Sequence, residues 1–262
     1  MRPANPADFE AIDWSQPWLS TWRNRGEPLA ALAGRVGTIE ALNAAVAGSI
    51  DLRAGPLRFV AHAELPMGEA YESFIERTAC VPTRVNLHDF FNGLAWLVYP
   101  AMKQRLNELQ ACELARDASR TSRGAVRDAL TLLDENGAWL RAPPLLLDAL
   151  RRRDWRALFT VHRQLWDEAR LEVFGHALIE KLVRPRKPIT AHVWVVPEDA
   201  TSTMQMFTDL LPLQRLADKP FLPLPVLGVP GWWLPNESPE FYQDASVFRP
   251  LQRQTATRGS LS

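Results

Sequence analysis

Apolar side chains recur at helical spacing over most of this 262-residue chain, and shorter alternating stretches separate the helical ones. The helical spacing predicts helices within the ranges 28–48, 69–81, 87–99, 143–170 and 203–216. Alternation predicts strands at 56–65 and 190–197, and the stretch 171–185 fits either a strand entering a helix at Gly175 or one helix. The expected fold class is therefore α+β, mainly helical, with a small mixed or antiparallel sheet.

One stretch carries the signal of a β-hairpin. In ALTLLDENGAWLRA (129–142), Asn136 and Gly137 stand between two apolar runs, and this dipeptide accepts the positive φ angles of a type I′ turn. We therefore predict a hairpin over 129–142. On a regular strand, Asp128 and Asp134 are six residues apart and lie on the same face.

The order of these elements, without a clear linker or repeat, predicts a single α+β domain over 1–250. Residues 1–28 are expected to be an extended lead-in whose tryptophans pack onto the body. Prolines recur from 220 to 239, which predicts an extended C-terminal wrap, because proline cannot donate to a strand ladder. The tail 251–262 is expected to be disordered.

Charge and cysteine content argue against several classes of protein. The 30 Lys and Arg residues balance 30 Asp and Glu residues, whereas nucleic-acid modules usually have a basic excess, so nucleic acid is not an expected partner. No apolar run approaches the roughly 20 residues that span a bilayer, and no secretory signal is visible, so we expect a cytoplasmic protein away from membranes. Cys80 and Cys112 are too few for a disulfide framework and have no zinc-ligand spacing. The oligomeric state is not indicated.

Polar side chains are dense in VPTRVNLHDFFNGLAWLVYP (81–100), where nine positions include Arg84, Asn86, His88, Asp89 and Asn92. Burying a polar group without a partner costs roughly 1–3 kcal/mol, so this segment is either a structural cluster or a functional site. Asn86 is the expected N-cap of the next helix, and Asp89 completes a variant capping box. His88 is then a candidate acid–base group, with Arg84 as an anion clamp and Asn92 as a substrate contact. The alternative is that these side chains serve folding alone.

A second polar group precedes Gly137. Asp134 and Glu135 are candidates for Mg²⁺ binding or acid–base chemistry, although acids beside a turn also bond their own backbone, and we favour that explanation for Glu135. We assign Asp128 and Asp134 as catalytic carboxylates and Arg127 as a substrate contact. A buried pair of Arg127 with an acid is the structural alternative.

The third candidate segment is FGHALIEKL (174–182), in which His176 and Lys181 are predicted to bind substrate. His176 and Glu180 are four residues apart and could share one metal ion, but a hydrogen bond on a helix surface explains the same spacing. His88, His176 and His192 would form one pocket if they converge. No motif identifies a cofactor or a particular metal.

Two classes of function fit these patterns. The first is an enzyme, with hydrolase as one option, that acts on a small polar or anionic ligand and uses His88 with Asp128 or Asp134. It requires His88, His176 and the 128–134 segment to face a common pocket. The second is a non-catalytic binding protein with a Trp- and Pro-rich C-terminal surface. That surface would be built from Trp232, Trp233, Phe241 and Tyr242, and burial of the two tryptophans would count against it.

Several blocks of sequence together resemble a known family. These blocks are VPTRVNLHDFFNGLAWLVYP, LNELQACE, RDALTLLDENG, FGHALIEKL, PITAHV and VPGWWLPNE. From about Pro56 to Pro250 the chain resembles a proteobacterial family catalogued as a domain of unknown function, DUF3025. Leu133 is a mild departure, since an aromatic residue is expected before DENG. The resemblance implies no activity or cofactor, but it places the candidate polar residues within the family's motif blocks.

Overall fold

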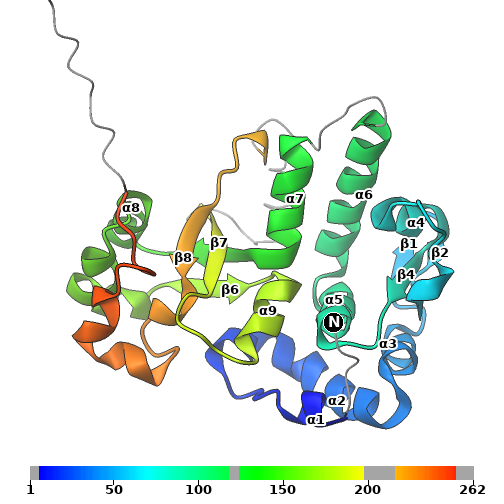
Figure 1. The fold of residues 1–262 in the computed structure, drawn as a ribbon, viewed down its shortest axis with the longest axis horizontal. Helices are drawn as coiled ribbons and strands as arrows, with labels where there is room; N and C mark the ends of the chain where they lie inside the picture. Colours follow the sequence, from blue (N-terminus) through cyan, green and yellow to red (C-terminus); the bar gives the residue numbers. More distant parts are fainter. Residues whose placement is uncertain (1–5, 118–123, 198–215, 252–262) are drawn as a thin grey trace, which may run out of the picture.

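The computed structural model describes residues 6–117, 124–197 and 216–251. These parts are mainly helical with small sheets, so the predicted α+β class is confirmed (Figure 1). The helices are α1 (Pro6–Glu10), α2 (Ser20–Val36), α3 (Thr38–Val46), α4 (Tyr71–Thr78), α5 (Leu87–Val98), α6 (Pro100–Asp117), α7 (Ala125–Asn136), α8 (Pro144–Arg152) and α9 (His176–Leu182). The strands are β1 (Asp51–Leu52), β2 (Gly55–Pro56), β3 (Arg58–Ala61), β4 (Cys80–Thr83), β5 (Gly137–Arg141), β6 (Arg170–Val173), β7 (Thr190–Val195) and β8 (Leu222–Pro225).

The main sheet is four-stranded and mixed, in the order β6-β5-β7-β8. Strand β5 runs antiparallel to β6 and parallel to β7, and β8 closes the other edge antiparallel to β7. In the parallel pair, Gly137 lies opposite His192 and Trp139 lies opposite Trp194. The first residues of β5 are therefore held beside the middle of β7, which brings the end of α7 next to His192.

Helix α5 lies at the centre of the helical part and is buried along almost its whole length. The N-terminal helices α1, α2 and α3 pack beneath it, and α6 and α7 stand above it (Figure 1). Trp22 is fully buried and donates from its indole nitrogen to the Val173 carbonyl at 2.8 Å, which ties α2 to the end of β6. The core is thus continuous from the N-terminal helices to the sheet.

The prediction of an extended lead-in over 1–28 is wrong, because α2 already begins at Ser20. Its buried residues Trp22, Gly26, Leu29, Ala30 and Ala33 follow helical spacing and cover the core with one face. The expected packing of the N-terminal tryptophans onto the body is confirmed, because Trp14, Trp18 and Trp22 are all buried.

The predicted hairpin over 129–142 is also wrong. Residues 125–136 form α7, and the chain then enters β5 directly at Gly137. Gly137 has φ −73° and ψ 149°, which is extended backbone and not a type I′ turn. The buried Ala129, Leu130 and Leu133 match one face of a helix, and burial of that face overrides the Asn-Gly turn preference.

The Pro-rich C-terminal segment is partly in the sheet, contrary to the expectation that it lacks ladder donors. Strand β8 pairs with β7 as an edge strand, with Leu224 opposite Ala191. Its prolines alternate with leucines, so the N–H groups of every second residue remain available to the neighbour. The segment then continues as short 3₁₀ turns. The predicted helix at 203–216 and the tail at 251–262 lie outside the described residues except for Leu216 and Leu251. No helix within the described ranges is long and apolar enough to cross a membrane.

Candidate functional site

The first turn of α5 is fixed by side-chain caps, as predicted for Asn86. The Asn86 side-chain oxygen accepts the Asp89 N–H at 2.7 Å. Asp89 reaches back to the N–H of Arg84 at 2.6 Å rather than to that of Asn86, so the capping box is displaced by two residues. These two bonds hold the backbone on both sides of His88, the residue that points from this turn toward α9.

Helix α9 begins against the end of α7 because Gly175 precedes it. A Cβ atom on Gly175 would lie 2.4 Å from the Glu135 carbonyl oxygen and 2.6 Å from the Asn136 nitrogen, so only glycine permits this approach. The Gly175 N–H also donates to the Gly137 carbonyl at 2.8 Å. The start of α9, with His176, is therefore placed directly on the last turn of α7.

The three segments bring two histidines and a glutamate into contact. His88 donates from Nδ1 to Glu180 Oε2 at 2.9 Å. The Nε2 atoms of His88 and His176 are 3.3 Å apart, with the rings edge to face. His88 and Glu180 are about one-quarter exposed, whereas His176 is buried, so only His88 and Glu180 of the three are readily reached from solvent.

The protonation state of His176 follows from its partners. Its Nδ1 lies 2.8 Å from the backbone carbonyl of Asp134, and a carbonyl only accepts, so Nδ1 carries the hydrogen. Burial lowers the pKa of His176 to about 3, and the nearby positive charges of Lys103 and His88 add to this against the attraction of Asp134. His176 is therefore neutral, and its Nε2 lone pair faces His88.

His88 has the opposite tendency. Its hydrogen bond to the Glu180 carboxylate raises its pKa, although partial burial works the other way. In the imidazolium form, His88 donates from Nδ1 to Glu180 and from Nε2 to His176, and both contacts are satisfied. Loss of the Nε2 proton of His88 would leave the Nε2 lone pairs of the two rings facing each other. The two rings thus hold one proton between them, on the His88 side.

Behind the histidines lies a buried polar network centred on Lys103 of α6. Lys103 donates to both carboxylate oxygens of Asp134, at 2.6 and 2.9 Å, and to the side-chain oxygen of Asn92 at 2.8 Å. Asn92 donates in turn to the Tyr71 hydroxyl at 2.9 Å. Burial opposes ionisation of Asp134, but Lys103 and the two histidines outweigh it and lower its pKa, so Asp134 is a carboxylate. Asp134 is thereby neutralised by an ammonium group and positions the backbone that binds His176.

His88, His176 and most of the network line a pocket of about 450 Å³, which we call the acid–base pocket; Lys103 and Glu180 are bonded to its lining residues but do not line it themselves. Its charged and titratable lining residues are His62, Tyr71, Glu72, Arg84, His88, Asp89, Asp134, Glu135 and His176. Arg84 is exposed and donates to His62 at 3.0 Å. The Glu135 side chain has no hydrogen-bond partner among the described residues. Carboxylates outnumber cations on this wall, even with the ammonium of Lys103 behind Asp134.

The comparison with family models covers most of the chain: residues 57–252 match the family described as Protein of unknown function (DUF3025). The chain belongs to the DUF3025 family. No curated protein and no solved structure matches it. In this DUF3025 protein, the residues of the acid–base pocket all lie inside the matched range, whereas α1, α2 and α3 precede it.

Five of the residues that the sequence suggested do come together in the acid–base pocket of the DUF3025 protein: Arg84, His88, Asn92, Asp134 and His176. Their roles stay predictions. The prediction that Asp128 and Asp134 share one face of a strand is wrong, because both residues lie on helix α7. Two residues six positions apart on a helix point in different directions. Asp128 is 43% exposed, 3.8 Å from Lys219, and neither it nor Arg127 lines the pocket. Lys181 and His192 line a separate groove instead.

Sequence reasoning missed the partners that complete the pocket. Lys103 had one signal, since it is among only four lysines in a chain whose other 26 basic residues are arginine. Tyr71 and His62 had none, because their contacts are to residues about 20 positions away. Glu180 was considered as a metal ligand with His176, but it bonds His88. Within the described ranges, no group of three or more His, Cys, Asp or Glu side chains is placed to hold a metal ion.

Of the C-terminal aromatic residues of the alternative hypothesis, Phe241 is buried and Trp232, Trp233 and Tyr242 are half-buried rather than exposed. Trp232 packs at 6.1 Å from the buried Trp18, and Trp233 packs at 5.8 Å from the buried Phe241, measured between ring centroids. Tyr242 also donates to the Gly228 carbonyl at 2.9 Å. These rings mainly attach the C-terminal segment to the body, which weakens the case for a free binding surface.

Proposed function

We propose that this protein is an enzyme that performs general acid–base chemistry on a small polar substrate in the acid–base pocket, with hydrolysis as the reaction class. The observation that carries the proposal is the chain Glu180–His88–His176, in which one proton is held between two histidines of opposite pKa tendency. Titratable groups with pKa values pushed apart in one pocket are typical of acid–base pairs.

In this proposal, His88 is the catalytic residue that delivers or removes a proton. Glu180 is a positioning residue that orients the ring and stabilises its charged form. His176 accepts a hydrogen bond from Nε2 of His88 when the pocket is empty, and a substrate that enters takes over that hydrogen bond. Glu135 is the carboxylate left open to bind a donor on the substrate or a water molecule. Lys103 acts indirectly, because its hydrogen bond holds Asp134 in place.

The substrate is expected to be polar or positively charged rather than anionic. Glu72, Asp89 and Glu135 face the pocket, and only Arg84 among the lining residues is a permanent cation. An added anion would meet these carboxylates in a partly buried space, where like charges repel most strongly. Metal-assisted chemistry is not part of this proposal. A cytoplasmic setting is part of the proposal, in keeping with the two unpaired cysteines Cys80 and Cys112, and so is the bacterial origin that the family resemblance implies.

A panel of esters, amides, phosphodiesters and glycosides tests the enzyme proposal. We expect turnover of at least one class by the wild-type protein and a loss of about 100-fold or more in His88→Gln, as for other general acid–base residues. His162→Gln is the matched control, because His162 lies outside the pocket. Equal rates in the His88 and His162 variants, or no turnover in any class, would contradict hydrolysis.

The protonation states are tested separately by ¹⁵N NMR of the histidine side chains. At neutral pH we expect His88 to be protonated on both nitrogens and His176 on Nδ1 alone. A charged His176 or a neutral His88 would rule out the proton arrangement on which the proposal rests, whatever the substrate panel shows.

A further inference from the structure

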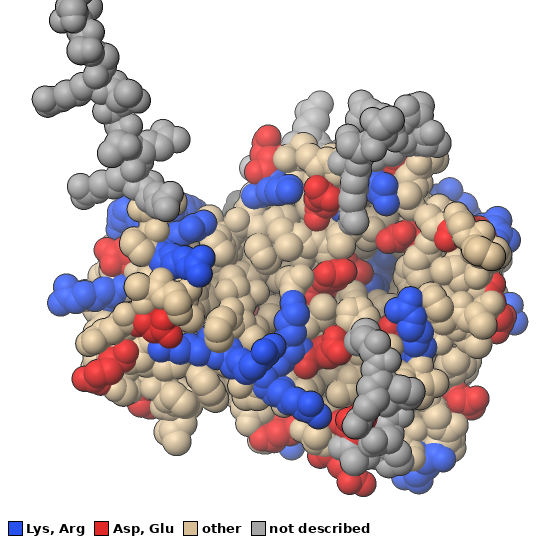
Figure 2. Space-filling view, viewed as in Figure 1, with Lys and Arg blue, Asp and Glu red and all other residues tan. Residues whose placement is uncertain are grey.

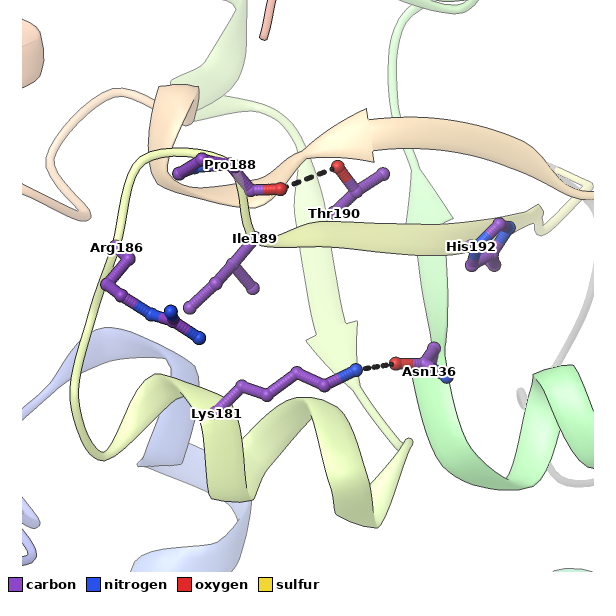
Figure 3. Close-up of a pocket in the computed structure, with 7 residues that line it drawn as sticks. All are labelled: Asn136, Lys181, Arg186, Pro188, Ile189, Thr190 and His192. Atoms are coloured by element: carbon purple, nitrogen blue, oxygen red, sulfur yellow. Dashed lines mark hydrogen bonds between the residues drawn. The ribbon is translucent and has the colours of Figure 1, made fainter.

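A second pocket, of about 460 Å³, lies between α9 and β7 on the other side of the α7 terminus; we call it the cationic groove (Figure 3). Lys181 reaches into it from α9, Arg186 from the connection that follows, and His192 from β7. Asn136, the last residue of α7, closes the end opposite Arg186 (Figure 3). The parallel register that sets Gly137 beside His192 explains why Asn136 and His192 share this space.

The groove contains two permanent cations and no carboxylate among its lining residues. Lys181 donates to the Asn136 side-chain oxygen at 2.8 Å, and the Arg186 side chain has no hydrogen bond or ion pair with any described residue. The adjacent basic residues differ, since Arg184 lies 4.0 Å from Asp8 and Lys187 lies 3.2 Å from Asp244. Figure 2 shows Lys and Arg side chains gathered over this connection. The two cations that face the groove are thus the ones without a carboxylate partner.

The remaining polar groups can also meet an anion. The Asn136 side-chain nitrogen has no acceptor among the described residues, because its oxygen is the atom that binds Lys181. His192 has no hydrogen-bond partner there either; burial and the nearby Lys181 lower its pKa, so at neutral pH it keeps one N–H donor and no charge. Donors therefore approach the groove from α9, from the connection, from β7 and from the end of α7.

We propose that the cationic groove binds the phosphate group of a small ligand. A phosphate is tetrahedral and offers three or more acceptor oxygens with up to two negative charges, which matches an arginine fork, an ammonium and two neutral donors on different walls. A carboxylate is planar, carries one charge and meets only two of these groups well. The proposed acid–base activity does not enter this argument, because no residue of the groove lines the acid–base pocket.

Binding of inorganic phosphate and of glycerol 3-phosphate to the full-length protein tests the proposal by calorimetry at about 0.15 M salt, where diffuse surface attraction is largely screened. We expect both to bind the wild-type protein, and Arg186→Ala and Lys181→Ala each to weaken binding about tenfold, as for loss of one charge-assisted hydrogen bond. Arg184→Ala is the matched control: it removes the same charge two residues away, outside the groove, and should change the affinity less than about twofold.

The ligand series separates the possible sources of the phosphate. Tighter binding of glycerol 3-phosphate identifies a phosphate monoester as the ligand, and equal or tighter binding of inorganic phosphate identifies the free ion. The proposal is overturned if neither binds, if malonate binds as tightly as phosphate, or if Arg184→Ala weakens binding as much as Arg186→Ala. The Arg186 side chain has no partner to lose, so its variant should keep the wild-type thermal stability.

Discussion

The acid–base pocket and the cationic groove share two walls, the last turn of α7 and helix α9, yet their charges are arranged in opposite ways. Directly behind the pocket, Lys103 is buried and bonded to the lining residues Asp134 and Asn92. In the groove, Lys181 and Arg186 are exposed and face no carboxylate. A buried charge must be paired, because desolvation without a partner is costly, whereas an exposed charge can remain open to a ligand. Burial thus explains why one site is a closed network and the other an open one.

The largest predicted difference between the two sites is in the contribution of their lysines, Lys103 and Lys181, to the free energy of unfolding. Lys103→Ala should lower the free energy of unfolding by about 3–5 kcal/mol, because it leaves Asp134 as a buried charge without its partner. Lys181→Ala should lower it by less than about 0.5 kcal/mol, since Lys181 is exposed. Urea denaturation measures both. Similar losses in the two variants would remove the distinction between a closed and an open site.

The next largest effect is expected at the wall between the two sites. Gly175→Ala places a methyl group within 2.6 Å of the Glu135 carbonyl oxygen and the Asn136 nitrogen, so α9 must move away from α7. We expect a loss of about 1–3 kcal/mol, in the range of overpacked cores. NMR chemical shifts of the residues around His176 and around Lys181 should both change. Changes confined to one site would show that the wall is not shared.

The pH dependence of stability compares His176 with His192. Since the pKa of His176 falls from 6.5 to about 3 on folding, the unfolded chain takes up a proton first, and stability drops as the pH falls from 6.5 toward 3. His176→Asn keeps a donor for the Asp134 carbonyl but cannot titrate. At pH 4 the wild-type protein should have lost about 1–3 kcal/mol more than this variant, relative to pH 7.

His192→Asn is the control for that measurement. The pKa of His192 is also lowered by burial and by Lys181, but its side chain is only half-buried. Replacing His192 should therefore reduce the loss of stability at acid pH by less than replacing His176 does. Denaturant midpoints recorded across this pH range give both slopes. A larger effect at His192 would reverse the assigned order of burial.

The smallest effect concerns the charge on His88. Glu180→Gln removes the carboxylate that raises the pKa of His88, so that pKa should fall, and the stability that the raised pKa contributes below pH 6.5 should be lost with it. Glu135→Gln removes a more distant charge and should lower the same pKa by a smaller amount. NMR titration of the His88 ring measures both shifts. An equal shift in the two variants would mean that Glu180 acts only as one charge among several.

Local features of this protein were accessible from its sequence. The Asn86 cap and helix α5 follow from capping preference and apolar spacing, and the strand that enters α9 at Gly175 is one of the two alternatives that the sequence allowed. The Asn136–Gly137 turn was wrong because its preference is local, while α7 is stabilised by burial of Leu130 and Leu133 against distant parts of the chain.

The site was accessible only in part, for a related reason. His88 and Glu180 are 92 residues apart, and Lys103 and Asp134 are 31 apart, so no sequence period connects them. Density of polar side chains identified the segments that contribute, which is why His88, Asn92, Asp134 and His176 were found. Polar density could not show that Lys181 belongs to a different site, because the neighbouring residue Glu180 contacts His88 while Lys181 lines the groove.

The acid–base pocket and the cationic groove meet at the backbone of Glu135 and Asn136, which contacts Gly175: Glu135 lines the pocket and Asn136 lines the groove. Asp134, whose carbonyl bonds His176, directly precedes Glu135, and Asn136 accepts a hydrogen bond from Lys181, so a shift of this turn on anion binding would also move the carbonyl that holds His176. Thermodynamic linkage then requires reciprocity: the change that the anion makes in the proton affinity of the histidine pair equals the change that protonation makes in the affinity for the anion. If anion binding in the groove shifts this turn, occupancy of the groove and protonation of the histidine pair are thermodynamically coupled.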